Sequence, residues 1–201
     1  MASSIACSKF KNMVIGAKIL SDFQGKISPS CGDQHLVDQT CLKAAVANAV
    51  GCWEGYIEEV LREFVSKVRV QADRRAWTLI AQYEALVDKL ASDLNTPNWD
   101  KARELILTVS GMDPYASWIW SEKFPNQNDT KVFFDGVMRV RHAFAHGFPL
   151  PRDIPGVATS GVLDVGYVGD VLACITFFVD VTDALLEHEL THRHSCASGW
   201  A

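Results

Sequence analysis

Apolar residues recur every three or four positions over most of the chain, which is the period of an amphipathic α-helix. The clearest stretch runs from about residue 36 to residue 70. Its apolar face consists of Leu42, Val46, Ala49, Val50, Trp53, Ile57, Val60, Leu61, Phe64 and Val68. A weaker pattern of the same period lies within residues 1–35. The chain is therefore expected to begin with a short helix and continue into a long one.

The same period predicts further helices after the long one. Residues 74–94 continue it, and Asn98 is a suitable N-cap for a helix that ends at Gly111. Residues 112–120 fit a short helix or turn. Another helix is expected over 130–147, where Gly147 followed by Pro149 is typical of a helix end, and a last one from about 164 to 192.

The expected architecture is all-α, because no segment shows the strict alternation of a β-strand. A single-domain helical bundle accounts for the order and length of the helices. We expect an N-terminal segment over residues 1–35, the helical domain over 36–194 and a C-terminal tail over 195–201. The proline- and glycine-rich loop at 148–161 is of a kind that often carries function.

The amino-acid composition and the net charge limit the kinds of binding partner that the chain can have. The 201 residues are 48% hydrophobic and 21% charged, which is typical of a globular protein and excludes general disorder. The net charge is −5, and the sequence pI is about 5.6. A chain of this charge has no global attraction for polyanions, so any contact with nucleic acid requires a local basic patch.

The cysteines and the apolar runs indicate a cytoplasmic protein. The six cysteines form no Cys-x-x-Cys pair, and a reducing compartment suits free thiols within helical patterns. The N-terminus carries lysines among its apolar residues, unlike a signal peptide. The longest apolar run, Val171 to Val179, is shorter than the ~20 residues that span a bilayer. We expect no membrane partner and no cofactor.

The segment "HELTH" fits the metalloprotease pattern H-E-x-x-H, with His188 and His192 as zinc ligands and Glu189 as base. A catalytic zinc needs a third protein ligand, and only His194 or Cys196 follows. Neither continues the spacing of the metzincin motif. The simpler interpretation is a solvated helix end, where cationic histidines suit the helix dipole. We therefore expect no metal centre, although the three histidines could bind metal adventitiously.

The expected helix at 130–147 carries an unusual set of polar groups. On an ideal helix, a narrow polar stripe contains Asp135, Arg139, His142 and His146. The opposite sector is apolar and contains Phe133, Val137, Val140, Phe144 and Phe148, widened by Phe134, Met138 and Ala145.

Arg141 falls among the apolar positions of this helix, about 140° from His146. An arginine there needs a carboxylate, because an unpaired buried charge is costly. Glu54 lies at the border of the long helix's apolar face and is the candidate partner. The alternative without a functional role is that the polar stripe is an ordinary solvent-exposed face and that the side chain of Arg141 extends outward to water.

The segment "RHAFAH", from Arg141 to His146, resembles the R-x4-6-H signature of HEPN domains, with His142 as the polar residue that often follows the arginine. The stretch "CWEGYIEEVLREF" is similar to the early helix of the RiboL-PSP-HEPN-like branch. The C-terminal part of the chain is also similar to that branch, because "AHG" is expected to end a helix, prolines follow it, and a final long helix completes the domain. The resemblance covers roughly residues 36–192.

The resemblance implies a metal-independent endoribonuclease that works as a homodimer with a composite site at the interface. It further implies a toxin of a toxin–antitoxin pair or an antiviral effector, with RNA as substrate and an antitoxin as possible partner. Arg141, His146 and His142 would be catalytic, and Glu54 would support them.

The residue types fit this chemistry, because histidine can move protons near neutral pH and arginine matches a phosphate. Arg139 gives the x6 spacing and remains the second candidate for the catalytic arginine. Arg152, from the loop, could add positive charge to the shared groove. The alternative function is a non-catalytic HEPN-like module that binds nucleotides or proteins.

Overall fold

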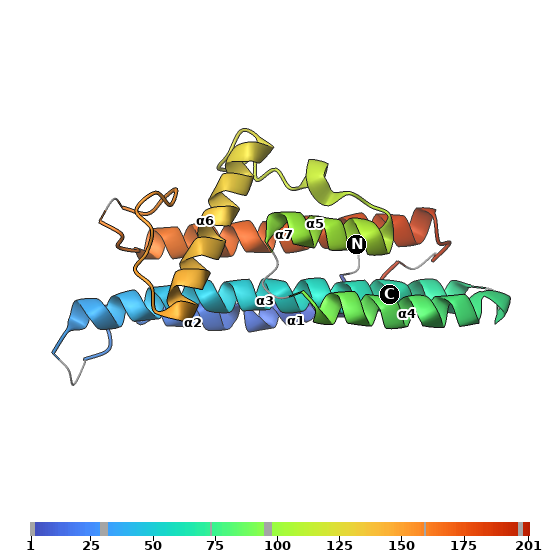
Figure 1. Ribbon diagram of the computed structural model, residues 1–201, viewed down its shortest axis with the longest axis horizontal. Coiled ribbons are helices and arrows are strands. Elements are labelled where there is room, and N and C mark those ends of the chain that lie inside the picture. Colours follow the sequence, from blue (N-terminus) through green and yellow to red (C-terminus); the bar gives the residue numbers. More distant parts are fainter. Residues whose placement is uncertain (1–2, 29–31, 73, 95–97, 159, 197–198) are drawn as a thin grey trace. The chain divides into compact units, whose positions relative to one another are not determined.

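The computed structural model describes residues 3–28, 32–72, 74–94, 98–158, 160–196 and 199–201. Within these residues the regular secondary structure is helical, with no strand, so the chain is all-α, as its periodicity predicts (Figure 1). The α-helices are α1 (Ile5–Met13), α2 (Ile15–Asp22), α3 (Gln34–Gln71), α4 (Trp77–Ser92), α5 (Trp99–Ser110), α6 (Gln127–His146) and α7 (Val165–His192). Two short 3₁₀ helices, η1 (Arg74–Ala76) and η2 (Pro114–Ser117), complete the set.

The helix boundaries follow the local signals in the sequence. The side chain of Asn98 accepts a hydrogen bond from the backbone N–H of Lys101 and so caps α5, and Gly111 ends that helix in a left-handed conformation. The long helix and the last helix begin and end within two residues of the expected positions. The N-terminal segment differs, because it contains two helices, α1 and α2, where one was expected.

The chain divides into two compact units. The first contains Met1–Phe10, Glu54–Ile119 and Phe178–Ala201, and the second contains Lys11–Trp53 and Trp120–Phe177. Helices α3 and α7 contribute to both units. The division expected from sequence, at residues 35 and 194, remains a prediction.

An aromatic cluster forms the centre of the first unit. The rings of Trp99, Trp118 and Phe178 lie 5.0–5.5 Å apart, centroid to centroid, and are almost fully buried. The indole N–H of Trp118 donates to the hydroxyl of Thr182 on α7 over 2.9 Å. Such aromatic contacts add to the free energy gained from burial alone.

The start of α1 is anchored in the same unit. Both the backbone N–H and the hydroxyl of Ser4 donate to the buried carboxylate of Asp183. The backbone N–H groups of Ile5 and Ala6 donate to Glu63, so a carboxylate faces the N-terminus of the helix, where negative charge is favourable. The indole N–H of Trp200 donates to the backbone carbonyl of Asp183.

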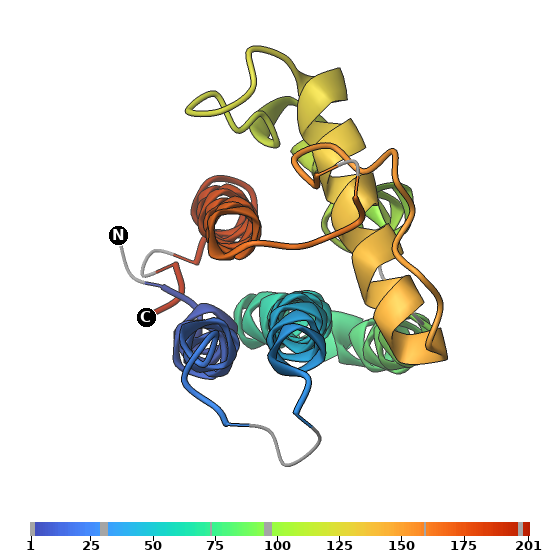
Figure 2. The ribbon, with the colours of Figure 1, turned by 90° about the vertical axis from the view of Figure 1, so that its left-hand side faces the viewer.

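The second unit is built around α6, which lies across the first parts of α3 and α7 (Figures 1 and 2). Phe134 of α6 meets Trp53 of α3 edge to face, and Phe133 contacts the ring of Tyr167 on α7. The side-chain amide of Gln39 makes two hydrogen bonds with the backbone of Leu163, of 2.8 and 2.9 Å. The hydrogen bonds of Gln39 thus hold the end of the α6–α7 loop that leads into α7.

By length and composition, α7 could cross a membrane. The uninterrupted apolar run within it, Val171 to Val179, is too short to do so by itself. The core helix of a soluble protein passes the same test. The side chains of Val171, Ile175 and Phe178 on this helix are fully buried.

The cysteines in the described part of the chain are free thiols: Cys7, Cys41, Cys52, Cys174 and Cys196. All but Cys41 are buried, in keeping with the expected role of small apolar side chains. Burial raises the pKa of the Cys174 thiol, which keeps it protonated.

Candidate functional site

The helix that carries the candidate residues is defined at both ends by its own sequence. The side chain of Asn126 accepts a hydrogen bond from the backbone N–H of Asp129 and caps the start of α6. Gly147 ends the helix at a φ of 67°, as its position in the sequence predicts. The N–H of Phe148 then donates to the carbonyl of Ala143 over 2.9 Å, which is the pattern of a Schellman cap. His146 is therefore the last residue of a well-terminated helix.

The apolar sector of α6 is buried along most of its length but emerges at its end. The buried residues of the sector are Phe133, Phe134, Val137, Met138 and Val140. Phe144 is 36% exposed and Phe148 is 58% exposed, and Ala145 between them is exposed too. The end of α6 thus presents aromatic surface outward. Phe148 lies beyond the last helical residue and packs against the histidines of the polar stripe, not in the opposite sector where an ideal helix would place it.

His142 and His146 lie together on this exposed turn. Their ring centroids are 4.4 Å apart, and the rings are tilted by 51°. The ring of Phe148 stacks on His146 at 5.7 Å and contacts His142 at 6.1 Å. Two imidazoles that both reach solvent can exchange protons with one bound group. The spacing of four residues in the sequence correctly places them on one face.

The two candidate arginines have different surroundings. Arg139 makes a bidentate pair with Asp153 of the following loop, with N–O distances of 2.6 and 3.1 Å. The carboxylate raises the pKa of Arg139, and the guanidinium holds the pKa of Asp153 below its usual range. Arg141 is half-buried. Arg139 therefore already has an anionic partner within its own unit, which the sequence analysis did not anticipate.

The expected pair between Glu54 and Arg141 stays a prediction. Glu54 lies half-buried on α3 in the first unit, whereas Arg141 belongs to the second. Arg152, which was expected to add positive charge, is exposed in the loop between α6 and α7.

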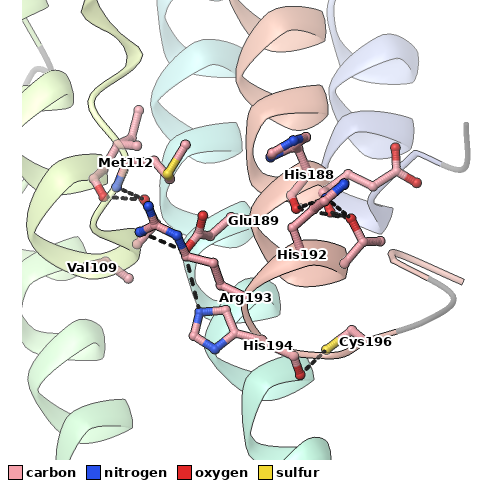
Figure 3. Close-up of polar contacts among 12 residues, drawn as sticks. Val109, Met112, His188, Glu189, His192, Arg193, His194 and Cys196 are labelled. Carbon is pink, nitrogen blue, oxygen red and sulfur yellow. Dashed lines mark hydrogen bonds and ion pairs between the residues drawn. The ribbon is translucent and has the colours of Figure 1, made fainter.

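The "HELTH" residues have a different arrangement from a zinc-binding helix with a catalytic base. The exposed rings of His188 and His192 stack 3.9 Å apart, and Nδ1 of His192 lies 2.9 Å from the backbone carbonyl of His188. Glu189 is buried away from them and faces Arg193 at 3.5 Å and His194 at 3.9 Å (Figure 3). Within the described residues, no cluster of three or more His, Cys, Asp or Glu side chains could hold a metal.

Comparisons with protein-family models, with curated proteins and with solved structures find no match for this chain.

Proposed function

We propose that this chain is a metal-independent endoribonuclease with a HEPN-like helical domain, and that its active site lies at the exposed end of α6. The observation that carries the proposal is the histidine pair, whose exposed rings are 4.4 Å apart. His142 directly follows Arg141, and His146 is the last residue of the helix before the Gly147 cap. The resemblance of the segment to the R-x4-6-H signature supports the same assignment.

RNA carries its own nucleophile, the 2′-OH, so the protein need only move protons and stabilise charge. One imidazole takes the proton from the 2′-OH as its oxygen bonds to phosphorus. The bond from phosphorus to the 5′ oxygen breaks, and the other imidazole delivers a proton to that oxygen. The products are a 2′,3′-cyclic phosphate and a 5′-OH. Arg141 stabilises the charge on the phosphate oxygens.

The contacts of the two arginines favour Arg141 over Arg139 for this role. The guanidinium of Arg139 is occupied by the carboxylate of Asp153, which would have to be displaced before a phosphate could bind. Arg139 and Asp153 then form a structural pair that holds the loop beside α6. Asp153 gave no signal in the sequence, because only the folded loop brings it back to the helix.

The site is completed by a second copy of the chain. On an ideal helix Arg141 points about 140° away from His146, so one helix is a poor site for one phosphate. A two-fold axis presents the same patch twice, so that each phosphate receives arginine and histidine from opposite sides. The exposed Phe144 and Phe148 supply the apolar surface that such an interface needs. A toxin or an antiviral effector is the cellular role that this activity suits.

The experiment measures cleavage of labelled single-stranded RNA by the purified chain in EDTA. We expect His146→Ala and Arg141→Ala each to lower the rate by about 10²–10⁴-fold, since each removes a proton-transfer or charge-stabilising group. The matched control is His188→Ala, which alters the other exposed histidine pair at a helix end and should leave the rate unchanged.

Three outcomes would contradict the proposal. Native cleavage by His146→Ala would mean that the site lies elsewhere. Activity that is lost in EDTA and restored by zinc would point to metal chemistry at "HELTH". Absence of cleavage by the native protein, with binding of nucleotides or proteins retained, would favour the non-catalytic module.

A further inference from the structure

Helix α3 ends and α4 begins at the right-hand end of Figure 1. An exposed tryptophan at the start of α4 has two arginines close to its ring. The guanidinium carbon of Arg69 lies 5.8 Å from the ring centroid of Trp77, and that of Arg74 lies 5.7 Å from it. The indole N–H of Trp77 donates to the carbonyl of Ala72 over 3.3 Å, which fixes the orientation of the ring. Trp77 is nevertheless 41% exposed. A large, rigid, exposed aromatic ring of this kind is suited to contact with a partner.

The end of α3, the start of α4 and the residues between them, here called the tip, are rich in positively charged residues, although the chain as a whole is acidic. Between residues 67 and 77 the sequence has one lysine and three arginines against a single acidic residue, while the whole chain has a net charge of −5. Glu84 pairs with Arg69 at 2.9 Å and offsets part of this charge. Arg74 and Arg75 are exposed, and Arg74 pairs with no carboxylate in the described part of the chain. This tip is thus a local basic patch of the kind that an acidic protein needs to bind a polyanion.

We propose that the tip formed by Arg69, Arg74, Arg75 and Trp77 is a docking site for single-stranded RNA. The exposed arginines Arg74 and Arg75 contact backbone phosphates, because the planar guanidinium matches phosphate oxygens in a fork. Arg69 is paired with Glu84 and lies beside the ring of Trp77. Trp77 stacks on an unpaired base, which every base permits because each has a flat face. The inference deepens the proposed ribonuclease function, on which it rests, by giving the enzyme a surface that binds RNA through residues other than those proposed for cleavage.

An anionic membrane surface is the competing partner, because Val70 and Leu79 are also exposed near the tip. RNA is favoured by the chemistry of the cluster. Its cations are arginines gathered at an indole face, and both groups stack on bases. Amphipathic segments that bind membranes instead present a broad apolar face, which two separated aliphatic residues do not form.

The experiment measures the binding of a fluorescently labelled 12-nucleotide RNA to the full chain by anisotropy, in a His146→Ala background that keeps the RNA intact. Trp77→Ala should weaken binding about 5- to 100-fold, because it removes one stacked base, whereas Trp77→Phe should retain most of the affinity. Arg74→Glu with Arg75→Glu should weaken binding more than about tenfold and make the slope of log affinity against log salt shallower by about 1.4. The matched control is Lys18→Glu with Lys26→Glu, the same change in charge at two exposed lysines of the other unit, with an expected effect of at most about threefold.

Equal losses in the two double variants would show that only overall charge matters and would overturn the proposal, as would a Trp77→Ala protein that binds normally. Stronger binding of the tip to vesicles containing phosphatidylserine than to RNA would identify a membrane surface instead. Should Trp77→Ala fail to fold, Trp77→Phe and the arginine variants still decide the question. If RNA binding depends on the tip but the native protein cleaves no RNA, the proposed ribonuclease function is wrong and the RNA-binding site stands. If the native protein cleaves RNA and the tip variants bind and cleave it as well as the native protein does, the RNA-binding site is wrong and the ribonuclease function stands.

Discussion

Replacing Gly147 by alanine tests whether the end of α6 is fixed by backbone geometry. Gly147 has a φ of 67°, a conformation in which an L side chain clashes with its own backbone. A Cβ at this position would meet no other group within 4 Å, so the cost comes from the backbone conformation alone. We expect Gly147→Ala to lower the free energy of unfolding by about 1–2 kcal/mol.

Gly51 provides the matched control, because it lies within α3 and has equally open space around it. Its backbone is helical, so alanine should raise the free energy of unfolding by about 0.5–1 kcal/mol. For a chain of this size, 1 kcal/mol corresponds to roughly 2–4 °C in Tm. Gly147→Ala should therefore lower Tm by about 2–8 °C, and Gly51→Ala should raise it by about 1–4 °C.

Thermal unfolding followed by circular dichroism at 222 nm measures both variants. The two substitutions add the same methyl group, so the opposite signs isolate the effect of the left-handed backbone. If Gly147→Ala were as stable as Gly51→Ala, α6 would not end in a left-handed cap, and the placement of His146 at its last turn would be wrong.

Two further predictions address the interface and the buried core. Phe144→Glu places a charge on the exposed end of α6, where the dimer interface is proposed. We expect sedimentation velocity to show a monomer for this variant and a dimer for the native protein, and we expect the variant to lose RNA cleavage. A stable monomer that cuts RNA at the native rate would contradict the proposed composite site. Burial raises the pKa of Asp183 above its ordinary value of 3.8, although hydrogen bonds from Ser4 oppose the shift. The folded protein then binds this proton more tightly than the unfolded chain does, so the contribution of Asp183 to stability is greatest below 3.8 and is lost as the pH rises through the folded pKa. Urea unfolding from pH 3.5 to 7 should show the native protein losing stability relative to Asp183→Asn as the pH rises, and the opposite trend would contradict the assignment.

Local signals in the sequence predicted the helices well, because the end of a helix is determined largely by the residues next to it in the sequence. Asn98, Gly111 and Gly147 act at the positions where their residue types are favoured. Periodicity was less informative at the N-terminus, where a weak apolar pattern over residues 1–35 could not show that the helix breaks between Met13 and Ile15.

The candidate site was only partly predictable, because some of its contacts are between residues far apart in the chain. The spacing of four residues was enough to bring His142 and His146 together. Asp153, by contrast, reaches Arg139 only after the intervening loop has folded back on α6. One reason for this close approach is Gly136, where a Cβ would come within 3.0 Å of the side chain of Ile154. No periodic pattern encodes such a contact.

Two histidine pairs with the same sequence spacing lie at the ends of α6 and α7. Their surroundings differ, and the surroundings are the basis for choosing between them. Each pair has histidines four residues apart at the end of a long helix, and each brings its rings within 4.4 Å. Sequence spacing alone therefore cannot choose between His142 with His146 and His188 with His192. Beside the second pair, the acidic residue Glu189 is buried and faces Arg193 and His194 rather than the two stacked rings. The first pair instead lies near Arg141 and exposed aromatic rings, which are the groups that the proposed phosphate site and the proposed dimer interface require.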